Sequence, residues 1–374
     1  MKKLLSIILL TATTMAFTSC SNSKKLEVSQ IVVDNFNLGT GVNVSHWLSQ
    51  SDRRGEERAK QITKKDFDAI ASMGFDHVRL PIDEVQMYDE NMKRNDEAFT
   101  LLENAINWTL ENNMNIIVDM HITRSFHFND ENAGGNTLFQ SEEAQQHLVT
   151  MWKDLQKFLC KYPNDRLAYE LLNEAISPTH EGLNNLEGRL ISAIRELEPN
   201  RFIVVGSNWQ GSPETIQYMQ LPPNDKHLII TFHYYNPLLL THHQAPWTAT
   251  KNYDGPITYP GMLISDTTVL EKYDTETKQT CLKLNGYWDK ETLYNQIKPA
   301  IDKAAEFGVQ AYCGEFGIYP QFIDTAMRIQ WYKDICSIFK DNNISNAHWC
   351  YKGDFPVVDK DLSPNEITPI LLQN

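Results

Sequence analysis

The chain has 374 residues and a formal net charge of −14 at pH 7, and 41% of its residues are hydrophobic. This length accommodates one large α/β barrel or two ordinary domains, and the composition is that of a globular protein. The acidic balance argues against nucleic acid and against an anionic membrane surface as partners. A neutral ligand would be indifferent to this charge.

The first 19 residues have the pattern of an export signal. Lys2 and Lys3 precede an apolar run over residues 4–10, and a stretch of small residues leads to Cys20. This ending resembles a bacterial lipoprotein signal, in which Cys20 would carry the lipid. Phe17 stands where such signals prefer Leu, so cleavage by an ordinary signal peptidase is the alternative. The run is too short to span a bilayer.

We therefore expect three segments: a signal peptide over residues 1–19, a tether over 20–37 and one folded domain over 38–374. The protein would be exported to the periplasm, the outer membrane or the cell surface, and it would contact a membrane only through its lipid anchor. We expect a monomer.

The remaining cysteines are odd in number and no pair has CxxC spacing, which predicts neither a zinc site nor a disulfide framework. They are predicted to be small core residues: Cys160, Cys281, Cys313, Cys336 and Cys350. No Gly-rich phosphate motif follows the first predicted strand, and the sequence predicts neither a cofactor nor a metal.

Short apolar runs alternate along the chain with segments of helical periodicity. The runs predict strands at residues 39–47, 75–83, 115–121, 166–175, 201–209, 227–237, 309–317 and 345–353. Helices are predicted at 63–73, 101–110, 148–159, 183–197, 293–304 and 327–338. Thr63 with Asp66 predicts a capping box, and Ser363 with Glu366 predicts the start of a short C-terminal helix.

This alternation demands a parallel sheet, and roughly eight strand–helix units over this length predict an α/β fold, a single (β/α)₈ TIM barrel. A doubly wound open sheet is the rival, and the barrel is favoured by the number of units. Residues 238–290 are rich in Trp, Tyr, Pro and Gly and are predicted to form a long loop after the sixth strand, on the active face.

Two apolar runs end in carboxylates: Glu174 follows Asn173, and Glu315 lies in GEFG. A buried parallel strand accommodates a charged group best at its C-terminal end, where α/β enzymes place their chemistry. Polar or aromatic residues recur at such ends, and any one alone would more often be structural. Besides Asn173, Glu174 and Glu315, the polar or aromatic residues at predicted strand ends are Arg79, His121, His233, Tyr235 and Trp349.

Two carboxyl groups that flank a sugar are what glycosidic bond hydrolysis requires, one as proton donor and one as nucleophile or base. Aromatic rings such as Trp349, Trp209 and Trp247 would stack on sugar faces. The predicted partner is a neutral β-linked polysaccharide or oligosaccharide.

The chain resembles glycoside hydrolase family 5, from about Gly39 to Lys352. The segments that carry the resemblance are Asn173-Glu174, the strand ending in His233-Tyr234-Tyr235, the GEFG of Glu315, and Trp349; the run from His233 to Trp247 is similar to bacterial endo-β-1,4-glucanases of the family.

The resemblance implies that Glu174 is the general acid/base and that Glu315 is the nucleophile, held by Arg79 and Tyr235. Asn173 would bind the 2-hydroxyl of the sugar at the cleavage point. His121 and His233 would bind sugar hydroxyls or adjust the protonation of the glutamates. Trp349 would form the floor of the subsite at the cleavage point. Some relatives carry two adjacent histidines where this chain has Met120-His121, which leaves sugar preference open.

Three other interpretations stay open at this point. A β-mannanase, xyloglucanase or mixed-linkage glucanase would use the same scaffold. A barrel metallohydrolase is disfavoured because no metal-ligand spacing is visible. A surface lipoprotein that only binds glycan is disfavoured because it would have no use for both glutamates.

Overall fold

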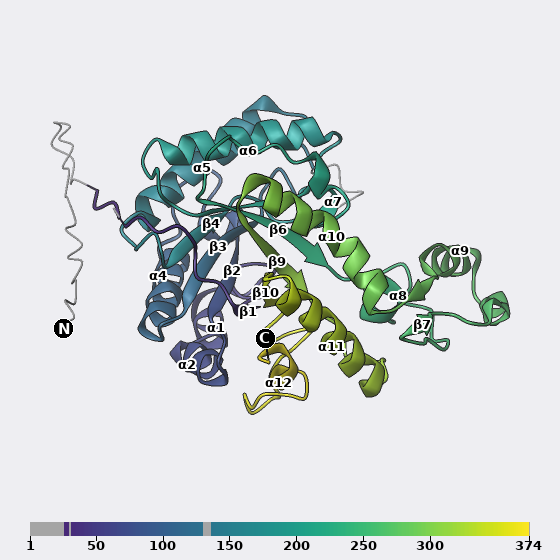
Figure 1. Ribbon diagram of the computed structural model, residues 1–374. Coiled ribbons are helices and arrows are strands. Elements are labelled where there is room, and N and C mark those ends of the chain that lie inside the picture. Colours follow the sequence, from purple (N-terminus) through teal and green to yellow (C-terminus); the bar gives the residue numbers. More distant parts are fainter. Residues whose placement is uncertain (1–25, 30, 130–135, 374) are drawn as a thin grey trace, which may run out of the picture.

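The computed structural model describes residues 26–29, 31–129 and 136–373. In this part of the chain eight parallel strands close into a barrel in the order β1-β10-β9-β6-β5-β4-β3-β2 (Figure 1). The predicted (β/α)₈ barrel is confirmed. The barrel strands are β1 (Thr40–Asn43), β2 (His77–Asp83), β3 (Asn115–Ile122), β4 (Leu167–Glu170), β5 (Ile203–Gly206), β6 (Leu228–Tyr234), β9 (Gln310–Phe316) and β10 (Ser345–His348).

Six long amphipathic helices surround the barrel, because each buries one apolar face against the strands. They are α2 (Lys64–Met73), α4 (Asp96–Glu111), α5 (Glu142–Leu159), α6 (His180–Arg195), α10 (Lys290–Phe307) and α11 (Thr325–Asp341). The predicted capping box of Thr63 and Asp66 is present at the start of α2. Short helical segments lie between these elements, among them α1 (Gly55–Gln61), α3 (Glu84–Met87), α7 (Asn208–Gly211) and η1 (Ile216–Tyr218).

The predicted short C-terminal helix is present, but the capping box predicted at its start is wrong. The last helix, α12 (Thr368–Leu371), begins after Ser363 and Glu366. The Ser363 hydroxyl donates to Asp361 at 2.6 Å, and Glu366 pairs with Arg328. Both side chains therefore have other partners, which the local pattern could not reveal.

The interior of the barrel is filled by side chains from successive strands, including Ile117, Ala168, Val204, Ile229 and Tyr312. Phe36 and Leu38 belong to the same buried cluster, and the ring centroids of Phe36 and Phe202 lie 5.4 Å apart. The Gln310 side chain bonds the backbone of Phe36 at 2.9 and 2.8 Å. The last residues before β1 thus pack into the barrel core.

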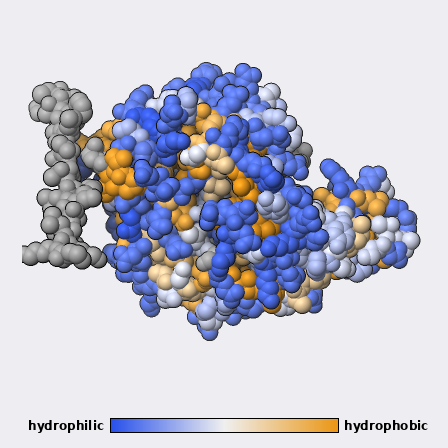
Figure 2. Space-filling model, in the orientation of Figure 1, coloured by the Kyte–Doolittle hydropathy of each residue, from blue (hydrophilic) through white to orange (hydrophobic). Residues whose placement is uncertain are grey.

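The segment after β6 is a small folded lobe, where the sequence predicted a long loop. It contains α8 (Leu238–Thr241), η2 (Thr267–Lys272), α9 (Thr275–Leu284) and an antiparallel pair of β7 (Gly261–Met262) with β8 (Tyr287–Trp288). Its own buried residues include Tyr253, Leu263, Leu270 and Cys281. The lobe projects from the side of the barrel (Figures 1 and 2).

The five cysteines of the described domain are buried and free, as predicted. No helix in the described ranges is long and apolar enough to cross a membrane. The predicted signal peptide and Cys20 lie outside the described residues.

Candidate active site

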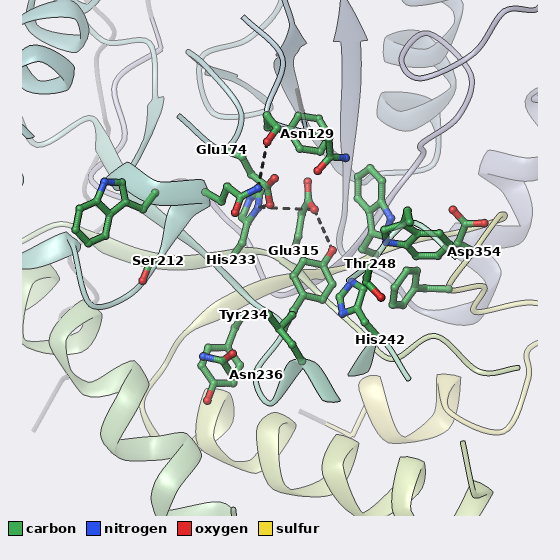
Figure 3. Close-up of a pocket in the computed structure, with 18 of the residues that line it drawn as sticks. Asn129, Glu174, Ser212, His233, Tyr234, Asn236, His242, Thr248, Glu315 and Asp354 are labelled. Atoms are coloured by element: carbon green, nitrogen blue, oxygen red, sulfur yellow. Dashed lines mark hydrogen bonds and ion pairs between the residues drawn. The ribbon is translucent and has the colours of Figure 1, made fainter. Parts of the chain in front are cut away.

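The C-terminal ends of the barrel strands surround a cleft with a volume of about 570 Å³ (Figure 3). Most of the predicted site residues line it: His121, Glu174, Trp209, His233, Tyr235, Trp247, Glu315 and Trp349. Arg79 and Asn173 are fully buried and bond to each other beneath it at 2.8 Å. The structure therefore brings together all ten predicted residues of the cleft.

Glu174 and Glu315 face each other at the centre of the cleft. A carboxylate oxygen of each lies within 4.8 Å of the other and of a ring nitrogen of His233. Glu174 follows β4 in a left-handed backbone conformation with φ of 44°, which is uncommon for a non-glycine residue. His233 Nδ1 lies 2.8 Å from Glu174 and 3.7 Å from Glu315.

Burial governs the protonation of Glu174, whose side chain is only 11% exposed. Loss of solvation raises the pKa of Glu174 to about 8; Arg79 opposes the rise and Glu170 adds to it. A carboxyl group with this pKa holds its proton at neutral pH and is able to donate it. Burial also lowers the pKa of His233 below its ordinary value.

Glu315 is held from two sides by hydrogen-bond donors. Arg79 Nη1 donates to Oε1 at 2.6 Å, and the Tyr235 hydroxyl donates to Oε2 at 3.0 Å. Arg79 lies in the middle of β2 rather than at its end, as the sequence analysis assumed. Its long side chain reaches from there to the floor of the cleft.

Two acidic residues at this floor were missed by the sequence analysis. Arg79 makes a bidentate pair with Glu170 at 2.7 and 2.8 Å, and its Nη2 lies 3.0 Å from Asp119. One guanidinium thus serves three buried carboxylates. Burial raises the pKa of Asp119 to about 7 and also raises that of Glu170. Their signal in the sequence was a charged residue inside an apolar run: Asp119 in NIIVDMH and Glu170 in RLAYELL.

Asn173 and His121 each present one polar atom that finds no partner among the described residues. Asn173 accepts from Arg79 through Oδ1, and its buried Nδ2 is free. His121 Nδ1 lies 2.7 Å from Asp119, which favours the proton on Nδ1 and leaves Nε2 as an acceptor. A donor and an acceptor are therefore available to ligand hydroxyls.

Aromatic rings line the cleft along its length. Trp349 is nearly buried, and its ring stacks on His121 at a centroid distance of 5.6 Å. Trp209 is 56% exposed and Trp247 is 48% exposed. Figure 3 shows Ser212, close to Trp209 in the chain, and Thr248, next to Trp247, on opposite sides of the two glutamates.

Glu174, His233 and Glu315 are also the group within the described residues whose ligand atoms are close enough to hold a metal ion together. The donor set of two carboxylates and one imidazole suits a divalent transition metal. The absence of a resident metal stays a prediction of the sequence analysis.

A (β/α)₈ barrel whose C-terminal face pairs two carboxylic acids in an aromatic-lined cleft has the architecture of a glycoside hydrolase. The family model described as cellulase, glycosyl hydrolase family 5, matches residues 37–354. The chain belongs to this family, which confirms the resemblance seen in the sequence.

The relatives agree with this assignment. Endoglucanase C of Acetivibrio thermocellus is 32% identical over 334 residues, which cover 87% of this chain and 94% of that protein. Cellodextrinase A of Ruminococcus flavefaciens is 27% identical and covers 82% and 83%. A structure of Thermotoga maritima Cel5A with mannotriose shares the fold, with a TM-score of 0.71 at 23% identity over 91% of this chain and 98% of that one.

Proposed function

We propose that the protein is a retaining endo-β-1,4-glucanase that cleaves a neutral β-glucan with Glu174 and Glu315. The observation that carries this proposal is the separation of less than 4.8 Å between carboxylate oxygens of the two residues. Retaining glycosidases hold their carboxyl groups about 5 Å apart, whereas inverting enzymes leave roughly 6.5–9.5 Å for a water molecule. The endoglucanase names of the relatives support the substrate class.

In the first step a Glu315 oxygen attacks the anomeric carbon, and the bond from that carbon to the glycosidic oxygen breaks. Glu174 gives its proton to the departing oxygen, which leaves a glycosyl ester on Glu315 and a carboxylate on Glu174. In the second step Glu174 takes a proton from water, whose oxygen attacks the anomeric carbon and releases Glu315. Because its pKa is raised, Glu174 is protonated at neutral pH and is able to donate this proton.

The surrounding residues would position these groups. Arg79 and Tyr235 fix the two oxygens of Glu315, which favours attack from one orientation. The free Nδ2 of Asn173 would donate to the 2-hydroxyl, and the free Nε2 of His121 would accept from a neighbouring hydroxyl. His233 would hold Glu174 in place.

The aromatic residues would bind the sugar rings. Trp349 would form the floor beneath the sugar at the cleavage point, and the exposed faces of Trp209 and Trp247 would stack on units to either side. Rings of this kind contact the C–H faces of sugars while polar side chains bind the hydroxyls.

We test this function with a reducing-sugar assay on carboxymethyl-cellulose, barley β-glucan, xyloglucan and glucomannan. We expect strong release from the glucans, which Glu174→Gln abolishes and Glu187→Gln leaves intact, since Glu187 is a buried glutamate of α6 outside the cleft. Preference for mannan would change the substrate and keep the mechanism. Binding without release from any polymer would contradict the proposal.

The nucleophile is tested separately. Glu315→Gly should be inactive, and azide should restore cleavage of an activated aryl glycoside with inversion at the anomeric carbon. Wild-type activity in the variant, or rescue with retention, would contradict the role of Glu315.

We further propose that the enzyme is a monomer that is exported through residues 1–19 and anchored through a lipid on Cys20. The support for export and for the anchor is the signal pattern of the sequence. Cys20→Ser should move the protein from the membrane fraction to the soluble fraction; no change in fractionation would contradict the anchor.

A further inference from the structure

A second hollow adjoins the catalytic cleft on the side of the projecting lobe. It has a volume of about 510 Å³ and lies between the loop after α8 and the start of α9. We call it the lobe groove; it is lined by Pro246, Trp247, Thr248, Ala249, Lys251, Asn252, Asp274, Glu276 and Thr277. Trp247 and Thr248 line both the lobe groove and the catalytic cleft, so the two hollows adjoin at these residues.

The lobe groove presents polar side chains without protein partners. Lys251, Asn252 and Glu276 line it, and none of the three side chains bonds or pairs with another residue of the described ranges. Most charged residues nearby are paired, as Lys278 is with Glu271 at 2.6 Å. A groove with an uncommitted cation, amide and carboxylate is suited to a ligand rich in hydroxyl groups, which can donate to some of these groups and accept from others.

Trp247 is held firmly at the junction of the two hollows. Its ring lies 5.1 Å from that of Tyr319 and 6.1 Å from that of Phe355, both edge-on or tilted. These contacts fix the indole from behind, yet 48% of the residue stays exposed. A rigid, half-exposed indole binds a sugar face at a low cost in conformational entropy.

The positions of the two glutamates indicate on which side of the cleavage point the lobe groove lies. Glu174 protonates the leaving oxygen in the proposed mechanism, so the leaving part of the chain lies on the side of Glu174. The segment that carries Trp209 packs against the turn of Glu174, through a bond from Gln210 N to Ala175 O at 3.2 Å. Trp247 packs instead on residues that follow β9 and β10, on the side of Glu315 and Trp349.

We propose that the lobe groove is a distal binding site for glucosyl units on the non-reducing side of the cleavage point. The inference rests on the proposed function, which supplies the glucan chain as ligand. A chain that extends from the catalytic cleft past Trp247 would reach the adjoining groove. Binding far from the reacting bond lowers the barrier to cleavage when it is used to position the substrate.

The test compares cellooligosaccharides from cellotriose to cellohexaose, labelled with ¹⁸O at the reducing end. The groove variant is Asn252→Ala with Glu276→Ala; the matched control is Gln279→Ala with Lys283→Ala, two exposed residues of α9 outside the groove. All four positions are at the surface, so folding should persist, and circular dichroism checks this. Trp247→Ala is the second variant.

We expect the ratio of kcat/KM for cellohexaose to that for cellotriose to fall about fivefold to tenfold in the groove variant, the effect of losing one or two hydrogen bonds. The control should keep the wild-type ratio. The labelled products should also become longer. The non-reducing end is bound less tightly in this variant, so more units of the chain bind on the leaving-group side of the cleavage point, which carries the label. Trp247→Ala should shift the products in the same direction.

Three results would overturn the inference in distinguishable ways. An unchanged ratio and an unchanged product pattern in the groove variant would remove the distal site and leave the proposed function intact. A shift toward shorter labelled products would contradict its assignment to the non-reducing side. If the wild-type enzyme cleaves none of the oligosaccharides or glucans, the proposed function and the distal site fall together.

Discussion

Arg79 is the residue on which the electrostatics of the site depend, and Arg79→Met tests this directly. The guanidinium is fully buried and lies 2.6–3.0 Å from oxygens of Glu315, Glu170 and Asp119. Removing one partner of a buried ion pair costs about 3–5 kcal/mol, because a buried charge is left uncompensated. With three carboxylates affected, we expect a loss of about 5 kcal/mol at pH 8, a large share of the typical stability of a domain.

The loss of stability in Arg79→Met should be smaller at acidic pH than at alkaline pH. Asp119 has a pKa of about 7 even with Arg79 present, and that of Glu170 is also raised. Without the cation both values rise further, so these acids are neutral at pH 5 and need no counter-charge. Protonation in the folded state then offsets part of the loss, and Arg79→Met should be less destabilised at pH 5 than at pH 8.

Urea unfolding followed by tryptophan fluorescence at both pH values measures this penalty. Arg79→Lys keeps a charge without the bidentate geometry and should fall between wild type and Arg79→Met. Arg189→Met is the control: Arg189 pairs with Glu142 at the surface, where an ion pair contributes at most about 1 kcal/mol. A loss below about 1 kcal/mol in Arg79→Met at pH 8, or an equal loss at pH 5, would refute the reasoning.

The value of kcat/KM should fall as the pH rises through about 8, because the general acid Glu174 must hold its proton; a pH–rate profile that stays flat to pH 10 would contradict this. Glu187 is buried with a pKa of about 8, well above its unfolded value of about 4.3, so it stabilises the fold at low pH and loses this contribution as the pH rises toward 8. Glu187→Gln should therefore weaken the fall in melting temperature between pH 5 and pH 8, and parallel curves would argue against it. In Gly314→Ala the new Cβ would lie 2.8 Å from Thr231 Oγ1 and 3.0 Å from His233 Nε2, so kcat should fall by about 10-fold or more; an unaffected kcat would show that the strand accommodates the methyl group.

The sequence was most informative where a strand meets the active face. Glu174, His233 and Glu315 could be placed at the C-terminal ends of strands, because each follows or ends an apolar run and a parallel strand tolerates charge mainly at its end. The inner acids Asp119 and Glu170 were missed for the same reason: they lie within strands, and their burial depends on Arg79 from another strand. A pairing between residues so distant in sequence leaves no local signal.

The sequence located the segment after β6 correctly, but it predicted a long loop there and missed the helices and strands of the lobe. Its strands β7 and β8 have two residues each, too few to show an alternation. Its helix α9 buries only Thr277 and Cys281, so no apolar stripe marks it. The lobe groove therefore arises from contacts between short segments that the sequence pattern could not resolve.

The direction of Glu315 depends on an irregularity that periodicity does not predict. Tyr312 belongs to the buried cluster inside the barrel and Cys313 to the core outside it, so strict alternation would turn Gly314 inward and Glu315 toward the helices. The register shifts here: Phe232 pairs with Cys313, and His233 pairs with Glu315. Gly314 is the extra residue of a bulge, and a bulge reverses the faces of the residues that follow it. Glycine fits this position because a Cβ would approach the side chains of Thr231 and His233, and His233 lines the cleft beside Glu315.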